Sequence, residues 1–283
     1  MDENKKILKL SEKDLRNLQL KSLEILMYFK SFCEKHKLRF YLCGGCCIGS
    51  LRHKGFIPWD DDVDVFMPRK DYEKLFLLWE KYADTSKYSC NRTTENKFIG
   101  NIMTTVSDNS TTVIHPWQVG KDGPKGVSMD ILPLDGCAPF GIKRKIQMMW
   151  SMIFSLYCSR MVPVNHGKLI SLIGKILLGV VPTNSAKNRI WKFAEKQMSK
   201  YDFDNSDYIT ELCSGPGYMK NEYPGEIFRD VVYKEFEGHM MPLPIGYDKY
   251  LKMAFGDYMK LPLKEKQVPH HDIVYMDLEN GNL

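Results

Sequence analysis

Residues 41–68 read YLCGGCCIGSLRHKGFIPWDDDVDVFMP, and this stretch decides the fold. Residues 38–43 are apolar enough for a short strand, and Gly44-Gly45 ends it before residues 46–52, which fit a short helix. After a glycine and a proline that signal a turn, residues 60–66 begin with acids and continue as an alternating strand. The stretch therefore predicts a strand, a glycine turn, a helix and a second strand.

Asp62 and Asp64 are the most informative pair in this stretch. Alternate side chains of a strand project to the same face, about 6.6 Å apart along it, so both carboxylates would point together while Val63 and Val65 face the core. Two such carboxylates converge on a hard divalent cation such as Mg²⁺, which completes its shell with water and phosphate oxygens. The alternative for the aspartates at positions 60–64 is a solvated acidic turn without function.

Two other features favour a site over a solvated turn. Gly44 and Gly45 precede the acids by about 17 residues, at a strand-to-helix junction whose free backbone N–H groups can hold a phosphate. Asp130 is an isolated acid in the apolar, strand-like run of residues 127–132. A buried carboxylate requires a partner or a metal, so Asp130 joins Asp62 as a candidate ligand.

The rest of the first half alternates between helices and strands. A capping-box pattern at residues 11–14 starts a long amphipathic helix that is expected to end near residue 37. Pro68 opens another helix that is expected to run to about residue 83, and residues 98–106 and 127–132 suggest further strands. The fold class is therefore α/β, in the α+β sense of a mixed sheet.

The chain changes character between Ile142 and Val181, where apolar residues are more numerous than a surface helix requires. One stripe at helical spacing comprises Ile146, Met149, Trp150, Ile153, Phe154 and Tyr157, with Met148, Met152 and Leu156 beside it. A second stripe comprises Leu169, Leu172, Ile173, Ile176, Leu177 and Val180. The favoured interpretation is internal packing of a helical subdomain.

The alternative for these helices is a peripheral membrane contact, either with the cytoplasmic leaflet or with the lipid tail of an acceptor. It rests on nearby basic residues, which are Lys143, Arg144, Lys145, Lys168 and Lys175. We expect three parts in the chain: a catalytic core at residues 1–137, an inserted apolar helical subdomain at 138–200, and a C-terminal part at 201–283 that completes the catalytic unit.

Composition excludes several classes of protein. The 283 residues carry 40 lysines and arginines against 35 aspartates and glutamates, a net charge of +5. These charges are too evenly mixed for a nucleic-acid binder. The hydrophobic fraction of 43% suffices for one large domain or two modest ones, and eight cysteines are too few for a disulfide scaffold, so reduced thiols are expected.

Two features predict a cytoplasmic location. The first twenty residues carry too many charges for a signal peptide. The longest uncharged run, Ile146 to Ser159, has 14 residues, short of the roughly 18 that indicate a transmembrane helix. A peripheral position on the inner face of the membrane is the alternative.

The order of Gly-Gly before a helix, D-x-D on the next strand and an aspartate on a later strand resembles the nucleotidyltransferase superfamily, which implies a nucleotidyltransferase-like mixed sheet. Residues 44–65 resemble, more narrowly, the signature of the LicD family, to which fukutin and the fukutin-related protein belong. Residues 129–136, 236–238 and 255–259 are similar to its other blocks. One departure is Cys46-Cys47, where the family commonly has Thr-Leu, and it removes a hydroxyl but no backbone N–H donor.

The resemblance implies a phosphotransferase that moves a phospho-alcohol, often phosphocholine, from a CDP-linked donor to a hydroxyl of a cell-surface glycan or its lipid-linked precursor, releasing CMP. It implies that Asp62 and Asp64 hold one or two Mg²⁺ ions, with Mn²⁺ as a substitute. Asp130 would complete the metal shell or take the proton of the acceptor hydroxyl. Choline, ethanolamine, glycerol and ribitol donors present the same diphosphate, so the residues do not select among them.

The candidates for binding the donor phosphates are Gly44, Gly45, Arg52 and His271. A guanidinium can fork onto a phosphate, but a structural salt bridge is an equal alternative for Arg52. Of the adjacent pair His270 and His271, at most one is expected to be functional, because neighbouring side chains point differently.

Other signals are weaker. Cys43 and Cys46 formally match a redox C-x-x-C motif and, with a histidine, a zinc site, but small buried residues are the better interpretation. Glu237 is either functional or part of a structural turn or ion pair. Four aromatic residues are candidates for a cage around a quaternary ammonium, but core packing is the favoured interpretation of each: Tyr41, Trp59, Trp117 and Tyr218.

Three other functions stay open at this stage. A metal-dependent glycosyltransferase also uses D-x-D, although normally after a complete nucleotide-binding half. A nucleotidyltransferase that transfers a nucleoside monophosphate shares the same core. A non-catalytic nucleotide-binding scaffold is the third, and the intact set of Asp62, Asp64 and Asp130 argues against it.

Overall fold

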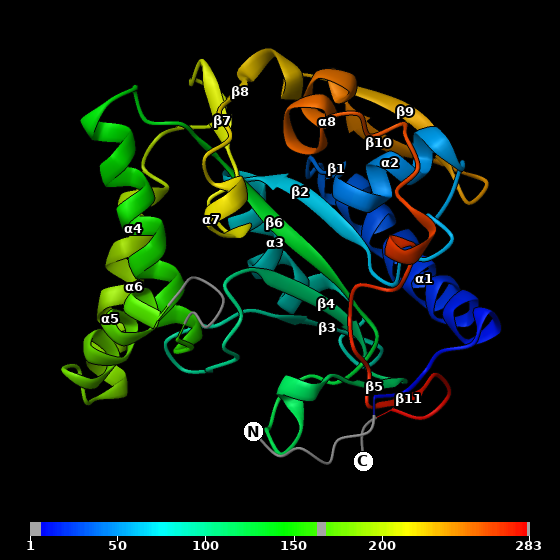
Figure 1. The fold of residues 1–283 in the computed structure, drawn as a ribbon, viewed down its shortest axis with the longest axis horizontal. Coiled ribbons are helices and arrows are strands. Elements are labelled where there is room, and N and C mark those ends of the chain that lie inside the picture. The colour runs from blue at the N-terminus through cyan, green and yellow to red at the C-terminus, as the bar shows by residue number, and fades with distance from the viewer. Residues whose placement is uncertain (1–6, 163–167, 282–283) are drawn as a thin grey trace.

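The computed structural model describes residues 7–162 and 168–281, and a curved mixed sheet lies at its centre (Figure 1). The strand order is β1-β2-β6-β4-β3, and β2 and β6 run parallel while the other neighbours are antiparallel. Two short strands, β7 and β8, extend the sheet at the far end of β6. The bounds are β1 Tyr41–Leu42, β2 Asp64–Pro68, β3 Tyr88–Asn91, β4 Thr104–Asp108, β6 Ser128–Gly136, β7 Tyr208–Thr210 and β8 Tyr223–Pro224. The predicted mixed α/β class is confirmed.

Three helices complete the first part of the fold: α1 (Glu12–His36), α2 (Gly44–Arg52) and α3 (Arg69–Tyr82). The predicted capping box begins α1, since the Ser11 hydroxyl accepts from the Asp14 N–H while the Asp14 carboxylate accepts from the Ser11 N–H. One face of α1 buries Ile25, Leu26 and Phe29 in the main core. Local patterns predicted these helices well, because capping and amphipathicity are set by neighbouring residues.

Two predicted strands are wrong at their beginnings. The second strand of the opening stretch begins at Asp64 rather than Asp60, because its ladder with β1 and β6 starts only there, at the register pairs Leu42↔Val65 and Asp64↔Asp130. Asp62 therefore lies in the loop before β2. Residues 98–103 precede β4 without forming strand.

A helical unit lies beside the sheet, on the left in Figure 1: α4 (Ile142–Ser159), α5 (Lys168–Gly179) and α6 (Asn184–Met198). Helices α4 and α6 share a second buried cluster, which also receives side chains from residues 212–219. Its buried members are Phe154, Leu156, Tyr157, Cys158, Trp191, Ala194, Met198, Leu212, Cys213 and Met219. The predicted internal packing is correct for this part of α4.

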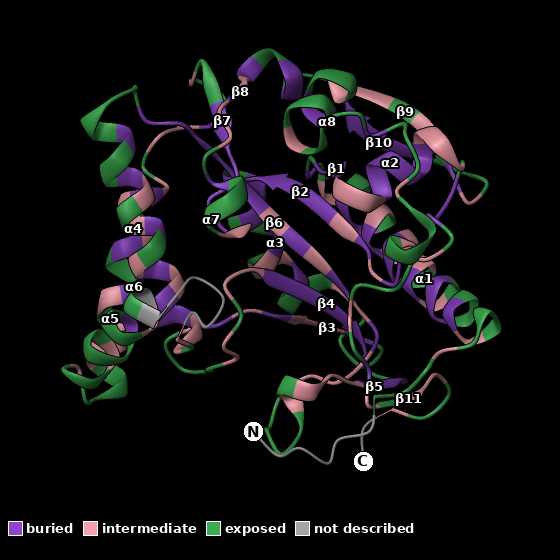
Figure 2. Ribbon diagram, viewed as in Figure 1, coloured by how far each residue is buried: buried purple, intermediate pink, exposed green. Residues whose placement is uncertain are grey.

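The second apolar stripe does not pack internally. Its six aliphatic side chains on and just after α5 are exposed, from 39% for Leu177 to 69% for Leu169, and Figure 2 shows most of α5 in the colour of exposed residues. Ile146, Met149 and Met152 of α4 are exposed as well. A stripe predicts which side chains share a face of a helix, but only the tertiary packing decides what that face meets.

Arg144 also differs from the expectation that it faces lipid head groups. Its guanidinium is buried and donates to Glu222, Gln147 and Thr210, so it joins α4 to the segment after β7. The side chain of Lys168 lies outside the described residues. Lys143, Lys145 and Lys175 are exposed.

The C-terminal part packs against the first part of the chain. Strand β11 pairs antiparallel with β5, and Tyr250 and Ile273 enter the main core beside residues of α1 and β2. The remaining elements are β5 (Thr112–Ile114), η1 (Pro116–Gln118), α7 (Gly215–Tyr218), η2 (Gly225–Phe228), β9 (Val231–Phe236), β10 (His239–Pro244), α8 (Tyr247–Phe255), η3 (Lys264–Lys266) and β11 (Tyr275–Asp277). Across the described ranges, none of the helices combines the length and hydropathy that crossing a bilayer requires.

Candidate active site

Asp64 and Asp130 begin the site at the centre of the sheet. They are register partners on the parallel strands β2 and β6, so their side chains leave the same face of the sheet from adjacent positions. Both are only partly exposed. Burial together with the charges of Asp62 and Asp130 raises the pKa of Asp64 well above its usual range, and burial with the charge of Asp62 raises the pKa of Asp130 to about 7.

Asp60 and Asp62 add two more carboxylates from the loop before β2. Burial and the charges of Asp62 and Asp61 raise the pKa of Asp60 to about 8, and burial is also the main cause of the raised pKa of Asp62. The buried Oδ2 atom of Asp60 has no hydrogen-bond partner among the described residues. Four acids thus share a small region in which their negative charges oppose one another.

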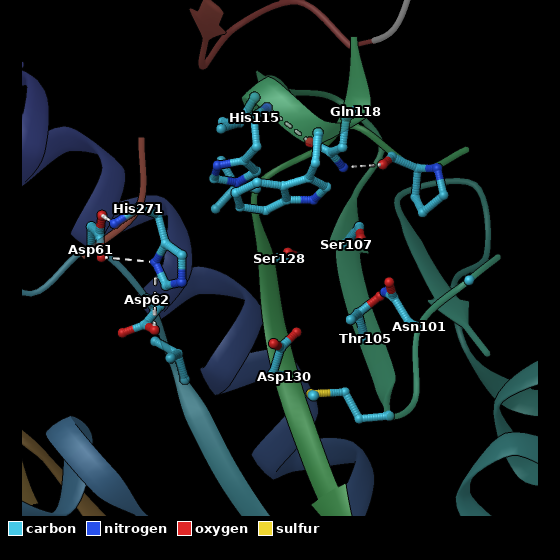
Figure 3. A pocket seen from close by; sticks show the side chains of 18 of the residues that line it. Asp61, Asp62, Asn101, Thr105, Ser107, His115, Gln118, Ser128, Asp130 and His271 are labelled. Carbon is cyan, nitrogen blue, oxygen red and sulfur yellow. Dashed lines mark hydrogen bonds and ion pairs between the residues drawn. The ribbon is translucent and has the colours of Figure 1, made fainter. Parts of the chain in front are cut away.

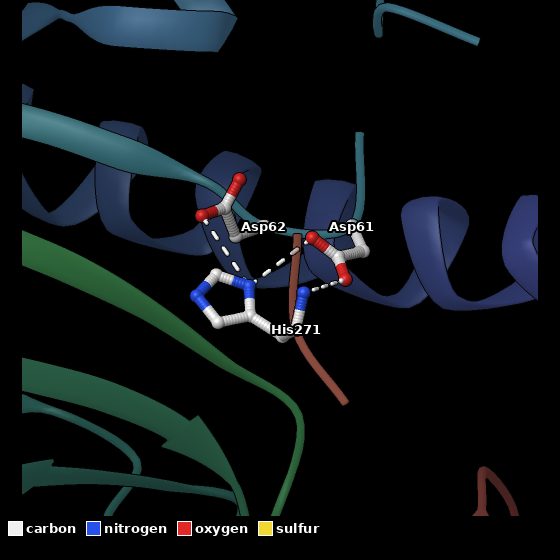
Figure 4. Close-up of side chains that lie close together, drawn as sticks. All are labelled: Asp61, Asp62 and His271. Atoms are coloured by element: carbon white, nitrogen blue, oxygen red, sulfur yellow. Dashed lines mark hydrogen bonds and ion pairs between the residues drawn. The ribbon is translucent and has the colours of Figure 1, made fainter. Parts of the chain in front are cut away.

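Asp61 points the other way and anchors the C-terminal segment. Its carboxylate accepts hydrogen bonds from the backbone N–H groups of His270 (3.3 Å) and His271 (2.9 Å), and the His271 Nδ1 lies 3.1 Å from its Oδ1 (Figure 4). Burial alone would raise the pKa of Asp61, but these bonds lower it. Asp61 therefore positions His271 across about 210 residues of chain.

His271 lies between Asp61 and Asp62, with its Nδ1 atom 3.7 Å from Asp62 Oδ2. The hydrogen bond with Asp61 raises the pKa of His271 to about 9 against the opposing effect of burial, and the charges of Asp61 and Asp62 add to the rise. Within the part of the chain that the structure describes, these three side chains place their ligand atoms within 4.8 Å of one another, a group that omits Asp64 and Asp130. The side chain of His270 is 63% exposed.

Gly44 and Gly45 form the first turn of α2 and adjoin the acids. Gly44 has a φ of +50°, and its N–H donates to the Tyr250 hydroxyl at 3.1 Å. A Cβ on Gly45 would overlap the Asp60 carboxylate, so glycine is required for this close approach. Both glycines are partly exposed. The turn thus places the positive end of α2 against the carboxylates.

Arg52 lies at the opposite end of α2, about 12 Å along the helix from the glycines. Its Nη1 donates to the backbone carbonyl of Tyr258 at 2.9 Å, and its guanidinium carbon lies 6.0 Å from the centroid of the Trp59 ring. Burial lowers the pKa of Arg52. Arg52 is not among the described residues that line the pocket, and its contacts are with Tyr258 of the C-terminal part and with the neighbouring Trp59.

A pocket of about 370 Å³ opens beside the acids. Figure 3 shows Asp61, Asp62 and His271 along one side, Asp130 on β6, and neutral polar side chains of Asn101, Thr105, Ser107, Ser128 and Gln118 around the rest. Ser155, Ser159 and Met161, at and after the end of α4, also line it. The pocket therefore joins the sheet, the C-terminal segment and the helical unit.

Trp117 lines the pocket and is 50% exposed. Its ring stacks on His115 with the centroids 4.4 Å apart and the planes 3° from parallel, and it meets His271 edge-on at 6.5 Å. The pairing of β5 with β11 and the contact of His115 Nδ1 with the Asp272 carbonyl (2.9 Å) hold this aromatic wall against the segment that carries His271.

The other aromatic candidates lie elsewhere. Tyr41 is buried in the core, and its hydroxyl donates to the Phe228 carbonyl at 2.7 Å. Trp59 is partly buried beside Arg52, and Tyr218 packs near Phe255. None of the three is among the residues that line the pocket in the described structure. The favoured core packing is correct for Tyr41 and wrong for Trp117, which of the four is the one that lines the pocket.

Two weaker candidates have structural explanations. Glu237 accepts two hydrogen bonds from Arg16 (3.0 and 2.6 Å) and one from the Phe56 N–H (3.1 Å), so it joins α1 to the loop before β2. Glu237 therefore belongs to a structural ion pair, which was one of the alternatives for this residue. Cys43 and Cys46 are free and buried, as predicted, and burial raises the pKa of both thiols.

The sequence did not predict separate roles for Asp60 and Asp61, and it did not identify the pocket residues His115 and Gln118. The run of three aspartates was visible, but only the fold shows that Asp60 lies against Gly45 and that Asp61 anchors His271. A single histidine and glutamine in a polar loop carry no pattern that could have identified them.

The acids fit a divalent cation. Carboxylate oxygens are ligands that Mg²⁺ and Mn²⁺ prefer. Burial is the main cause of the raised pKa values of Asp60, Asp64 and Asp130, and the negative charges of neighbouring aspartates add to it. The orphaned Asp60 Oδ2 points to a deficit of cations.

Paired carboxylates on the central parallel strands of a mixed sheet, beside a polar pocket, agree with the nucleotidyltransferase-like core that the sequence resemblance implies. Residues 37–122 match the family model described as LicD/FKTN/FKRP, nucleotidyltransferase domain. The chain is 34% identical over 269 residues to the lipopolysaccharide cholinephosphotransferase LicD of Haemophilus influenzae, a match that covers 91% of this chain and 96% of that protein. The chain belongs to the LicD family, and it is an enzyme of the LicD transferase type.

Proposed function

We propose that this enzyme transfers phosphocholine from a CDP-linked donor to a hydroxyl of a lipopolysaccharide or lipid-linked glycan, releasing CMP. The name of the H. influenzae relative supports the transferred group and the class of acceptor. The observation that carries the proposal is the pocket itself, since it has Asp62 and Asp130 on one side and the face-stacked Trp117 on another. Such a pocket offers one wall for phosphate chemistry and one for a quaternary ammonium.

Asp62, Asp64 and Asp130 would hold Mg²⁺ or Mn²⁺. When bound, the metal neutralises charge on the donor diphosphate and stabilises the leaving CMP. Asp61 would act through His271 rather than as a ligand, because its carboxylate already accepts two backbone hydrogen bonds and contacts the imidazole. His271 and the glycine turn of α2 would face the donor phosphates. Arg52 would take part only if its hydrogen bond with the Tyr258 carbonyl broke.

In the transfer step, the acceptor oxygen forms a bond to the phosphorus that carries choline, and the bond from that phosphorus to the CMP oxygen breaks. CMP leaves with the electron pair of the broken bond, and the acceptor hydroxyl gives up its proton. Asp130 either receives this proton or completes the metal shell. The neutral side chains of Thr105, Ser107 and Ser128 supply hydrogen-bonding groups that orient the substrates without repelling the diphosphate.

The two roles of Asp130 are separable. Asp130→Asn would be compared with Asp62→Asn in Mn²⁺ binding and in turnover. If Asp130 is a ligand, both variants lose Mn²⁺ affinity. If Asp130 is the base, its variant keeps Mn²⁺ and donor binding and loses only turnover, by about 10²- to 10³-fold or more.

Trp117 would recognise the trimethylammonium group. Trp117→Ala is expected to weaken binding of CDP-choline by about 2- to 30-fold while changing CDP-glycerol binding little, because only the first donor carries a cation for the ring face. Trp117→Phe is the matched control and should retain most of the preference. Equal losses for both donors would contradict this role.

The decisive test of the function offers the purified chain CDP-choline, CDP-ethanolamine, CDP-glycerol, CDP-ribitol and UDP-glucose with Mg²⁺, and measures the product formed on a lipopolysaccharide acceptor. The expected result is phosphocholine transfer with one CMP released per transfer and none after chelation with EDTA. Turnover confined to UDP-glucose would indicate a glycosyltransferase, and pyrophosphate release from CTP would indicate nucleotidyl transfer. Donor binding without any turnover would indicate a scaffold.

A further inference from the structure

The helical unit has a charge that the rest of the chain does not share. Residues 138–200 contain eleven lysines and arginines and one acidic residue, Glu195, a formal charge of +10. Since the whole chain carries +5, the remaining residues carry −5. The carboxylate of Glu195 forms ion pairs with Arg92 (2.8 Å) and Arg69 (3.4 Å) inside the protein. The unit is therefore strongly basic, although two acids from outside it pair with its residues: Glu95 with Lys192 (2.8 Å) and Glu222 with Arg144 (3.0 Å).

Helix α5 adds an apolar surface to this basic unit. Its six exposed side chains follow the i, i+3, i+4, i+7 spacing that normally faces a core, and the described residue that it buries is Gly174. We call this stripe the α5 surface: Leu169, Leu172, Ile173, Ile176, Leu177 and Val180. The helix is attached by its opposite side, where Leu178 packs on the second cluster and the Tyr157 hydroxyl donates to the Leu177 carbonyl at 2.8 Å. An amphipathic helix thus presents its apolar face outward.

Basic side chains accompany the α5 surface. Lys175 is exposed on the same helix, and Arg189 is exposed on the neighbouring α6. Lys192 of α6 is also exposed but forms an ion pair with Glu95 at 2.8 Å. Lys143 and Lys145 are exposed at the start of α4, about 18 to 21 Å along that helix from Tyr157, which contacts α5. Helix α5 lies at the outer side of the unit, away from the sheet (Figure 1). An exposed apolar stripe on a unit of net positive charge matches the interfacial zone of an anionic bilayer, where aliphatic groups enter the acyl boundary and cations meet lipid phosphates.

We propose that the α5 surface docks the enzyme on an anionic membrane. A second copy of the chain is the less favoured occupant, because it would bring an equal +10 charge against the first. The proposal stands without the assignment of the donor. A consequence rests on the proposed function: Ser155, Ser159 and Met161 belong both to this unit and to the pocket lining, so docking would hold the pocket near a lipid-linked acceptor.

Vesicle sedimentation with the full chain tests the proposal. At low salt the protein should bind vesicles of phosphatidylcholine containing about a third phosphatidylglycerol at least about tenfold more strongly than pure phosphatidylcholine vesicles, and high salt should weaken that binding. The double variant Ile173→Ser with Ile176→Ser should reduce binding about tenfold or more. Leu77→Ser is the matched control, because Leu77 of α3 is also exposed (69%) but lies outside the unit.

Each other outcome overturns the proposal. Absence of binding to the anionic vesicles at low salt, or equal loss in the Leu77 control, would exclude docking through α5. A dimer in analytical ultracentrifugation that the double variant dissolves, without vesicle binding, would assign the α5 surface to a second copy. Turnover with a detergent-dispersed acceptor should be unchanged in the double variant, so a failure of the proposed function is read separately from a failure of docking.

Discussion

Strand β6 carries two aspartates with opposite surroundings. Asp135 is fully buried near one end and receives two hydrogen bonds from the Arg69 guanidinium, at 2.8 and 2.7 Å. Asp130, five residues earlier, lies beside Asp64 and lines the pocket. Its nearest charges are mostly negative, and its pKa rises to about 7 through burial and the charge of Asp62.

The comparison separates a structural acid, Asp135, from a candidate catalytic acid, Asp130, on the same strand. Asp135 is compensated within the protein, and its ion pair extends through Arg69 to Glu195 of α6, which joins the sheet to the helical unit. The negative charge of Asp130 has no such partner in the protein, so we expect a bound cation or ligand to compensate it. Uncompensated carboxylates facing a pocket are costly for the fold, so their presence indicates a ligand that binds there.

The largest expected effect is on catalysis at Asp130. Asp130→Asn should lower turnover by about 10³-fold, because it removes a carboxylate from the reacting site. The same change should leave Tm equal or higher, because it also removes charge repulsion with Asp64. A stopped assay of CMP release and a thermal melt check both statements. A lower Tm with normal turnover in Asp130→Asn would mean that Asp130 is a structural acid, as Asp135 is.

The reverse pattern is expected at Asp135. Asp135→Asn should lower the free energy of unfolding by about 3 to 5 kcal/mol, because it leaves the buried Arg69 without its bidentate partner. Urea unfolding measures the loss, and turnover per folded molecule should stay near wild type. The double variant Arg69→Met with Asp135→Leu is the control, since removing both charges should recover much of the stability. No recovery would show that packing, rather than the charge left behind, causes the loss.

Asp61 is a third case: a buried acid that we expect to affect the site by holding His271 in position. Asp61→Asn should reduce turnover by about 10- to 100-fold, because the amide holds His271 less firmly. His270→Ala is the control and should change turnover little, since that side chain is exposed. The His271 resonance in a proton NMR titration provides the second measurement, and its pKa should fall in the Asp61 variant. An unchanged His271 titration would contradict the positioning role.

The smallest expected effect concerns Glu237, whose partner Arg16 is half exposed. Hydrogen bonds from Arg16 and Phe56 lower the pKa of Glu237 below its usual 4.5. Its contribution to stability is therefore present above about pH 4.5 and is lost as the pH falls through the lower folded-state pKa. Glu237→Gln should cost about 1 kcal/mol at pH 7 and progressively less in more acidic buffer. A difference that grew on acidification would have the wrong sign.

Local features of the sequence were predictable where their causes are local. The cap at Ser11 and the helix that begins after Pro68 each depend on residues a few positions apart. The expected strand face shared by Asp62 and Asp64 is wrong, because β2 begins only at Asp64, and the acid that shares the sheet face with Asp64 is Asp130 of β6. The boundary of β2 was not predictable, because it depends on where β1 and β6 supply hydrogen bonds. Arg52 could not be assigned either, because its partner carbonyl belongs to Tyr258, about 200 residues away.

The sequence alone was enough to predict the family and the fold class, because both depend on short motifs with distinctive spacing. The same motifs supplied the candidate acids, and their roles remain proposals. Only the tertiary structure decided that Asp61 positions His271, that Trp117 rather than Tyr41 faces the pocket, and that the apolar stripe of α5 is exposed. The physical reason is common to all three. Each depends on which surfaces meet after the chain has folded, and helical periodicity or residue type is the same whether a face meets a core, a ligand or solvent.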